Sequence, residues 1–306
     1  PGTGIGAVTI AEGGVLKLGI NNALRTDQNL TIGSAFNFAG SDTGTFDLAG
    51  FNQTVNALIG TKNSSNVGAD SIRIVTNSAT GTSTLTLTSG GANFLGFISD
   101  GSTRKVAVKC SANNANNVPN NSDNTYSGGL TLLGAIAPAT SGTRLLPFSG
   151  FTTVDPETGL VTSGPYGTGP IRIGEVSTDK VQVYFQTAGR TIANDIIVNS
   201  AAGTDTAGTF RVESGSNTIS GAILANEGSA FFRNNVNGLV TIGANGGVIA
   251  ATVTNMSLGA RVAGTAITGA NAVGTSGEIT ITVAAAASGA FAEGQGNFSI
   301  RLGPPA

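Results

Sequence analysis

Asp155 and Glu157 are the residues of this chain whose types and spacing could support catalysis. They flank Pro156 in the segment TVDPETG, and a pair of carboxylates can act as acid and base in the cleavage of a glycosidic bond. The same spacing around a proline is typical of a type I turn that an aspartate opens, and we favour this simpler interpretation. The chain contains no histidine, which excludes a Ser-His-Asp triad, a Cys-His pair and an imidazole-ligated metal.

The remaining acidic residues share no short spacing that would predict a metal site. No segment follows the pattern of a calcium-binding loop or of the Gly-Gly-x-Gly-x-Asp repeat, although a calcium ion held between loops stays an alternative. The glycine-rich segment GTGIGA at 2–7 lacks the Gly-Lys-Ser/Thr of a phosphate loop and is better explained as a turn. We therefore predict no catalytic, cofactor-binding or metal-binding residues and no cofactor. The acidic residues considered are Asp42, Asp47, Asp195, Asp205 and Glu213.

The single cysteine and the paired phenylalanines have structural and functional interpretations. Cys110 excludes an intrachain disulfide, and its place in VAVKCSA predicts a small buried side chain on a strand, with a reactive or intermolecular thiol as the alternative. For the phenylalanines we predict stacking in the core, and the alternative is a surface that binds sugars or another subunit. These phenylalanines are Phe94, Phe97, Phe231 and Phe232.

The charge of the chain argues against nucleic acid as a partner. Its net charge is −2, only 10% of the residues are charged, and no basic stripe is present to displace counterions from phosphates. We interpret Arg104, Lys105 and Lys109 as the solvated edge of a strand. No segment has the 18 or more consecutive apolar residues of a membrane helix, so we predict no membrane span within this sequence.

Alternation of apolar and polar residues with a period of two dominates the chain and predicts β-strands. Pairs such as Gly-Gly, Asn-Gly and Asp-Gly separate these segments and favour tight turns, and helical periodicity is not sustained. The sequence therefore predicts an all-β fold. The alternating segments are 7–10, 15–20, 30–32, 45–48, 71–75, 83–89, 106–109, 170–173, 180–185, 209–212, 239–242 and 278–284.

The lengths of these segments favour one all-β architecture. Short strands at irregular short intervals are typical of a parallel β-solenoid, in which like residues stack between successive circuits as aliphatic rows and asparagine ladders. Tandem β-sandwich domains are the alternative, but they usually have longer strands and a more aromatic core. Here aromatic residues make up 6% of the chain and tryptophan is absent.

An internal repeat and a cluster of prolines suggest how the chain is divided. The segment GTFDLAGFNQTVNALIG at 44–60 matches GTFRVESGSNTISGAIL at 208–224 without a gap, and six of the nine prolines lie between positions 119 and 170. Proline is typical of exposed loops. We therefore predict a first β-repeat unit at 1–120, a junction or inserted loops at 121–165, and a second β-repeat unit at 166–306. We expect the two units to have related structures.

Several phrases of the sequence resemble the autotransporter-associated β-strand repeats of Gram-negative surface and secreted proteins. The resemblance implies a right-handed parallel β-helix that serves as a passenger or stalk, and it supplies no catalytic motif. Segments 145–170 and 277–306 depart from the pattern of these repeats. The phrases that carry the resemblance are GTGIGAVTIAEGGVLKLGINNAL at 2–24, FDLAGFNQTVNALIG at 46–60, NTYSGGLTLLGA at 124–135, YGTGPIRIG at 166–174 and RTIANDIIVNSAAGTDTAGTFRVESGSNTISGAI at 190–223.

Together these features predict a structural or adhesive extracellular protein that is not an enzyme. An uncapped β-solenoid exposes unpaired backbone groups at its ends, so we expect homopolymerisation head to tail into a fibre or surface layer, by strand addition at the chain ends. Surface glycans are a second expected partner. The first residue is Pro1, which fits a mature chain at the bacterial surface after removal of a signal peptide. The alternatives are a β-helix that binds or cleaves polysaccharide and a capsid-type coat protein.

Overall fold

The computed structural model describes the chain as two compact units of β-structure. Unit 1 comprises Pro1–Leu133 and Gly150–Pro170, and unit 2 comprises Gly134–Ser149 and Ile171–Ala306. No helix occurs in the described residues, which confirms the all-β prediction. The described residues are 7–11, 13–33, 44–60, 73–90, 94, 96–111, 121–134, 143–145, 152–179, 181–199, 210–225, 229–242, 255–260, 270–273, 278–281 and 297–300.

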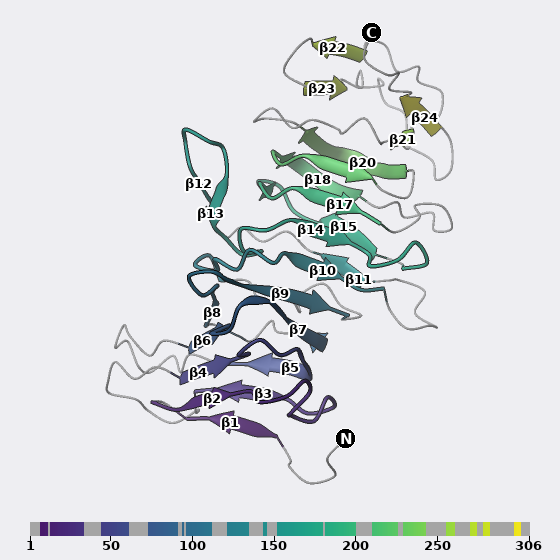
Figure 1. The fold of residues 1–306 in the computed structure, drawn as a ribbon. Coiled ribbons are helices and arrows are strands. Elements are labelled where there is room, and N and C mark those ends of the chain that lie inside the picture. The colour runs from purple at the N-terminus through teal and green to yellow at the C-terminus, as the bar shows by residue number, and fades with distance from the viewer. Residues whose placement is uncertain are drawn as a thin grey trace, which may run out of the picture. The chain divides into compact units, whose positions relative to one another are not determined.

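Two parallel sheets build unit 1 (Figure 1). Each strand pairs in parallel with the strand of its own sheet that follows it, and the chain alternates between the two sheets as far as β8. The first sheet contains β1 (Val8–Ile10), β3 (Leu30–Ile32), β5 (Gln53–Ile59), β7 (Gly81–Gly90), β9 (Arg104–Cys110) and β10 (Leu130–Leu132), and the second contains β2 (Val15–Lys17), β4 (Gly44–Asp47), β6 (Arg73–Thr76) and β8 (Phe97–Ile98).

Unit 2 repeats this parallel arrangement and then departs from it. Its parallel strands form two ladders, one of three strands and one of five, and β16 (Thr191–Ile192) pairs with β18. The first ladder is β14 (Ile171–Ile173), β17 (Ile196–Val198) and β19 (Ile223–Ala225); the second is β11 (Thr143–Leu145), β15 (Val181–Phe185), β18 (Phe210–Ile219), β20 (Ser229–Ile242) and β21 (Asn255–Ala260).

The last strands of unit 2 run antiparallel to their partners. Strand β24 (Asn297–Ile300) pairs antiparallel with β21, and β22 (Ala270–Val273) forms an antiparallel pair with β23 (Glu278–Ile281). The long parallel stacks nevertheless confirm the parallel β-helix. Tandem antiparallel sandwiches, the alternative prediction, are wrong because sequential strands stack in parallel rather than pair as hairpins.

A row of small and aliphatic side chains runs through the core of unit 1, perpendicular to the strands. Val55 pairs with Leu87, Leu87 with Cys110 and Cys110 with Leu132, and each of the four is at most 1% exposed. Such stacking arises because residues in register on parallel strands project to the same side of the sheet. Cys110 is therefore a core residue, as predicted, and burial raises the pKa of its thiol to about 12.

The two matching segments of the sequence bury the same aligned positions in their first part. Phe46 on β4 and Phe210 on β18 are both fully buried, and so are Val55 on β5 and Ile219 on β18, within 1% exposure. The alignment without a gap thus reproduces the inward positions over the first part of the repeat.

The match fails after an irregularity in β5. The pairing register of β5 with β7 shifts between Val55 and Ala57, so Leu58 becomes the buried residue and Ile59 is only half-buried. In the second copy the buried position is Ile223, which aligns with Ile59. A bulge inserts one extra residue and exchanges the two faces of a strand beyond it.

The segment predicted as a junction contains both core residues and a hairpin. Asn124 and Tyr126 are fully buried in unit 1, and Asn124 Nδ2 donates to the carbonyl of the buried Pro165. The hairpin pairs β12 (Thr153–Val154) with β13 (Val161–Ser163), and no residue from 152 to 163 is buried. The division of the chain at 120 and 165 stays a prediction.

Candidate functional site

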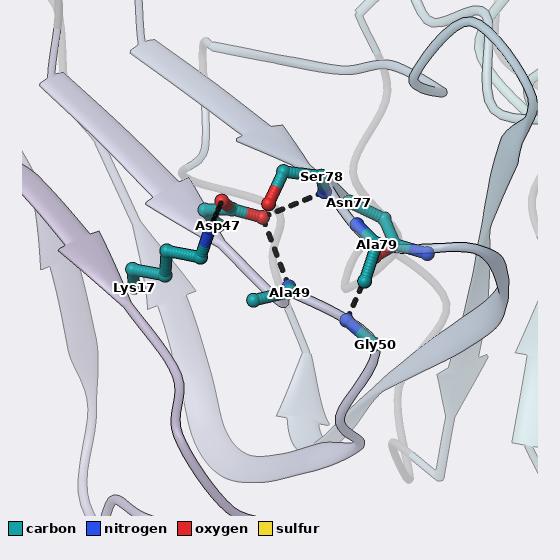
Figure 2. A network of polar contacts seen from close by, with 7 residues as sticks. All are labelled: Lys17, Asp47, Ala49, Gly50, Asn77, Ser78 and Ala79. Atoms are coloured by element: carbon teal, nitrogen blue, oxygen red, sulfur yellow. Dashed lines mark hydrogen bonds and ion pairs between the residues drawn. The ribbon is translucent and has the colours of Figure 1, made fainter.

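Asp47, at the end of β4, lies in the polar network at one corner of unit 1 (Figure 2). Its Oδ1 accepts hydrogen bonds from the backbone N–H groups of Ala49, at 2.9 Å, and Ser78, at 2.8 Å. The Nζ of Lys17 lies 3.8 Å from Oδ2, and Lys17 is largely exposed whereas Asp47 is buried. The carboxylate thus holds the backbone that leaves β4 and β6 and forms an ion pair with a side chain of β2.

Asn77 follows β6 and uses its whole side-chain amide in the same corner. Its Oδ1 accepts hydrogen bonds from Gly50 N, at 2.9 Å, and Ala79 N, at 3.2 Å. Its Nδ2 donates to Gly81 O, at 3.2 Å, and Lys105 O, at 3.1 Å. The side chain is fully buried, and its hydrogen bonds to four backbone groups satisfy an amide that water cannot reach.

The carboxylates of this corner are therefore occupied by the backbone. Asp100 repeats the arrangement, with Oδ1 accepting from Val106 N at 2.7 Å and Oδ2 from Ser127 N at 3.0 Å. Among the described residues no group of three or more His, Cys, Asp and Glu side chains could hold a metal ion. The corner network stabilises the fold and offers no reactive pair.

The predicted carboxylate pair lies on the exposed hairpin turn. Asp155 Oδ1 accepts hydrogen bonds from Glu157 N, at 2.8 Å, and Thr158 N, at 2.9 Å. These bonds lower the pKa of Asp155, with that from Thr158 the larger cause. A general acid must hold a proton, whereas the hydrogen bonds of this turn keep the carboxylate of Asp155 ionised. The interpretation of Asp155 as the residue that opens the turn is confirmed.

The other acidic candidates are dispersed. Asp195 is exposed and its Oδ1 accepts a hydrogen bond from Ala222 N at 2.9 Å. Glu213 lies on β18, but its side chain is outside the described residues, as are Asp42, Asp205 and segment 2–6. The described acids of the prediction are thus not brought together.

The predicted aromatic and basic positions have mixed outcomes. Phe94 is fully buried, as predicted for core stacking, whereas Phe97 is half-buried. Phe231 and Phe232 lie on β20, and their side chains are outside the described residues.

The strand-edge interpretation is wrong for Lys109, because it pairs with Thr86 of β7 on one side and Thr131 of β10 on the other. Arg104 and Lys105 pair only with β7 among the described strands, and Lys105 is exposed. Which strands are outermost depends on pairing that local sequence does not encode.

Asparagine ladders occur at the exposed corners, as the sequence predicted. Asn22 Oδ1 accepts from Thr54 N and Asn52 Oδ1 accepts from Thr84 N, each at 2.8 Å. Equivalent residues of successive circuits thus repeat one contact. The repeated contact satisfies backbone groups that would otherwise lack a partner where the chain turns.

Among the described strands, the first strand of each sheet in unit 1 has a neighbour on one side only. Within the described part of the chain, β1 pairs only with β3. Val8 N donates to Asn29 O at 3.3 Å, and Ile10 O accepts from Gly33 N at 2.7 Å. Because backbone groups alternate in direction along a strand, the N–H and C=O of the exposed Thr9 between them point away from β3.

Strand β2 has the same property and also exposes apolar side chains. Among the described strands it pairs only with β4, through bonds from Leu18 N to Asp47 O and from Thr45 N to Gly14 O. The backbone groups of Val15 therefore point away from β4. Val15 is 68% exposed and Ile20, just beyond the strand, is 65% exposed. We call β1, β2 and Ile20 the open edge.

The open edge is the feature of unit 1 best suited to contact another polypeptide, because it combines apolar surface with backbone donors and acceptors that have no partner among the described residues. The alternating segments at 7–10 and 15–20 signalled the strands, but not which side of each is unpaired. The described residues contain no helix that is long and apolar enough to cross a membrane. No protein-family model matches the chain, and no curated protein or solved structure shows significant similarity to it.

Proposed function

We propose that this chain is a non-enzymatic structural protein whose copies associate head to tail by adding strands to the open edge. The observation that carries the proposal is the direction of the backbone at Thr9 and Val15, whose hydrogen-bonding groups face away from their sheets. A strand from another copy would satisfy these groups and cover Val15 and Ile20.

Strand β24 is the complementary element we propose for the other end of the chain. It is the last strand of its sheet and, among the described strands, pairs only with β21. Its second side can therefore accept a strand, and contact between unlike ends of identical chains produces a filament when it does not close into a ring. Extracellular or cell-surface location, adhesion and glycan binding belong to the same proposal through the resemblance to autotransporter-associated repeats.

The absence of enzymatic activity is part of the proposal. The described carboxylates at Asp47, Asp100 and Asp155 bind backbone N–H groups, and this use fits a structural role. Release of reducing sugars from candidate bacterial surface polysaccharides would contradict this part of the proposal.

Substitution of Thr9 by proline tests the open edge. Proline removes the N–H that faces away from β3 and leaves the bonds of Val8 and Ile10 to that strand. We expect Thr9→Pro to raise the concentration at which assembly begins by about tenfold or more, equivalent to about 1.4 kcal/mol per contact. Thr9→Val is the matched control because it retains the N–H.

Val15→Lys tests the apolar part of the same edge, since a lysine on an edge strand opposes the approach of another strand. Sedimentation velocity across a concentration series measures both variants, and circular dichroism checks that each is folded. Assembly at the wild-type concentration by folded Thr9→Pro and Val15→Lys would refute the proposed contact.

A further inference from the structure

Arg73, the first residue of β6, carries a buried positive charge. It is 7% exposed, and its Nε donates to the carbonyl of Ile32 at 3.1 Å. In the described part of the chain no carboxylate forms an ion pair with it; the ion pairs there join Lys17 to Asp47 and Arg25 to Asp27. A guanidinium cannot lose its charge in a protein, so burial without a counter-ion is unfavourable.

Glycines of three successive circuits make room for this side chain. A Cβ added at Gly33 would lie 2.5 Å from Arg73 Nε and 3.2 Å from Nη2. One added at Gly60 would lie 2.9 Å from Cδ, and one added at Gly96 would lie 2.5 Å from the Cβ of Arg73. A side chain at Gly33 would meet the guanidinium of Arg73, whereas one at Gly60 or Gly96 would also meet the ring of Phe94, so these glycines leave space for both side chains.

Among the described residues, the guanidinium donates a hydrogen bond through its Nε, to Ile32 O, and through no other nitrogen. Arginine has five N–H donors in a planar fork, which matches the oxygens of a carboxylate, sulfate or phosphate. We propose that Arg73 binds a small oxyanion at the corner formed by Ile32, Gly33 and Gly60. The ligand supplies the negative charge that the described residues do not provide, and it accepts hydrogen bonds from the terminal nitrogens. This site is independent of the open edge and of self-assembly.

Thermal unfolding in sodium sulfate, compared with sodium chloride at equal ionic strength, tests the proposal. We expect the Tm of the wild-type chain to rise along a saturating curve, by about 5 °C when sulfate is about 100 times its Kd. Arg73→Met should abolish this saturating rise, and Arg73→Lys should weaken it because lysine lacks the fork. Arg172→Met, a half-buried arginine on β14, is the control that should keep the rise. Phosphate and acetate arms then distinguish inorganic oxyanions from carboxylates.

Isothermal titration of sulfate into the wild-type chain keeps the test decisive if Arg73→Met does not fold. Saturable binding that Arg73→Lys weakens at least about tenfold supports the site. No binding by the wild type, or an equal response from Arg73→Met, overturns it. The proposal also fails if sulfate stabilises Asp42→Asn or Asp70→Asn but not the wild-type chain. Sulfate would then bind only after a carboxylate of the chain had been removed, and that carboxylate would be the counter-ion of Arg73.

Discussion

The side-chain oxygen of Asn77 accepts a hydrogen bond from the backbone N–H of Gly50, 27 residues earlier, at 2.9 Å. The same amide donates forward to Lys105 O, 28 residues later, at 3.1 Å. One buried side chain therefore holds the backbone of three successive circuits together. Only 10% of the residues are charged, so few ion pairs can stabilise the corners of the solenoid. Side-chain amides such as that of Asn77 stabilise them instead, by hydrogen bonds to backbone N–H and C=O groups.

Asn77→Asp should destabilise unit 1 by about 2–4 kcal/mol at neutral pH. The substitution removes two donors and buries a new charge close to Asp47. Burial raises the pKa of the new carboxyl above its unfolded value, so the loss should be smallest at acidic pH and grow as pH rises above about 4. Urea unfolding at pH 4 and pH 7 measures it.

Asn52→Asp is the matched control for this prediction. Asn52 is exposed and its Oδ1 only accepts from Thr84 N, a role that a carboxylate oxygen retains. We expect a change within about 0.5 kcal/mol. Equal losses for the two variants would show that the donors of Asn77 and its burial contribute nothing.

Leu87→Ala should cost about 2–5 kcal/mol, because it opens a cavity in the row between Val55 and Cys110. The neighbouring outward residue Thr86 is half-buried, and Thr86→Ala should change the free energy of unfolding by about 0.5 kcal/mol or less. Chemical denaturation followed by circular dichroism compares the two. A loss at position 86 that matches the loss at position 87 would contradict the assigned faces of β7.

Cys110 should resist alkylation in the folded chain. Burial raises its pKa from 9.0 to about 12, so neither thiolate nor solvent access is available at pH 8. Iodoacetamide should modify it at least about 100-fold faster in denaturant than in buffer. Because the folded pKa is raised, the stability that the neutral thiol contributes is full below pH 9.0 and is lost as pH rises through about 12. Rapid labelling in buffer would place the thiol at the surface.

Asp155 should titrate below its ordinary pKa of 3.8, because its ionised form accepts two backbone hydrogen bonds. A lowered folded pKa means that the contribution to the turn is present above 3.8 and disappears as pH falls through the folded value. NMR titration of the Asp155 carboxyl carbon gives the pKa, and Asp155→Ala should loosen the hairpin without unfolding the core. A pKa above 3.8 would contradict the bonds to Glu157 N and Thr158 N.

Local sequence predicted the strands and the faces of many of them, but not their pairing. Alternation marks Val106, Val108 and Cys110 as inward residues of one strand, and all three are fully buried. It does not show that β9 is an interior strand, because parallel pairing joins residues more than 20 positions apart. This is why the edge interpretation is wrong at Lys109, which pairs with both neighbouring strands.

The β-strand irregularity and the long-range contacts could not be predicted from local sequence either. The register shift after Val55 depends on the partner strand β7, and the residue types next to Val55 do not predict it. The space around Arg73 arises from Gly33, Gly60 and Gly96, which local reading assigns to three unrelated turns. The hydrogen bonds of Asp155 within its turn, by contrast, span only three residues, and the pattern Asp-Pro-Glu-Thr-Gly predicted that turn correctly.

Electron microscopy of the purified chain at neutral pH, beside Thr9→Pro, tests the central claim of head-to-tail assembly through the open edge most directly. The account predicts regular fibres of the wild-type chain, with a subunit repeat close to the length of one chain, and separate particles of the variant. Separate wild-type particles at every concentration, or fibres that Thr9→Pro leaves unchanged, would contradict it.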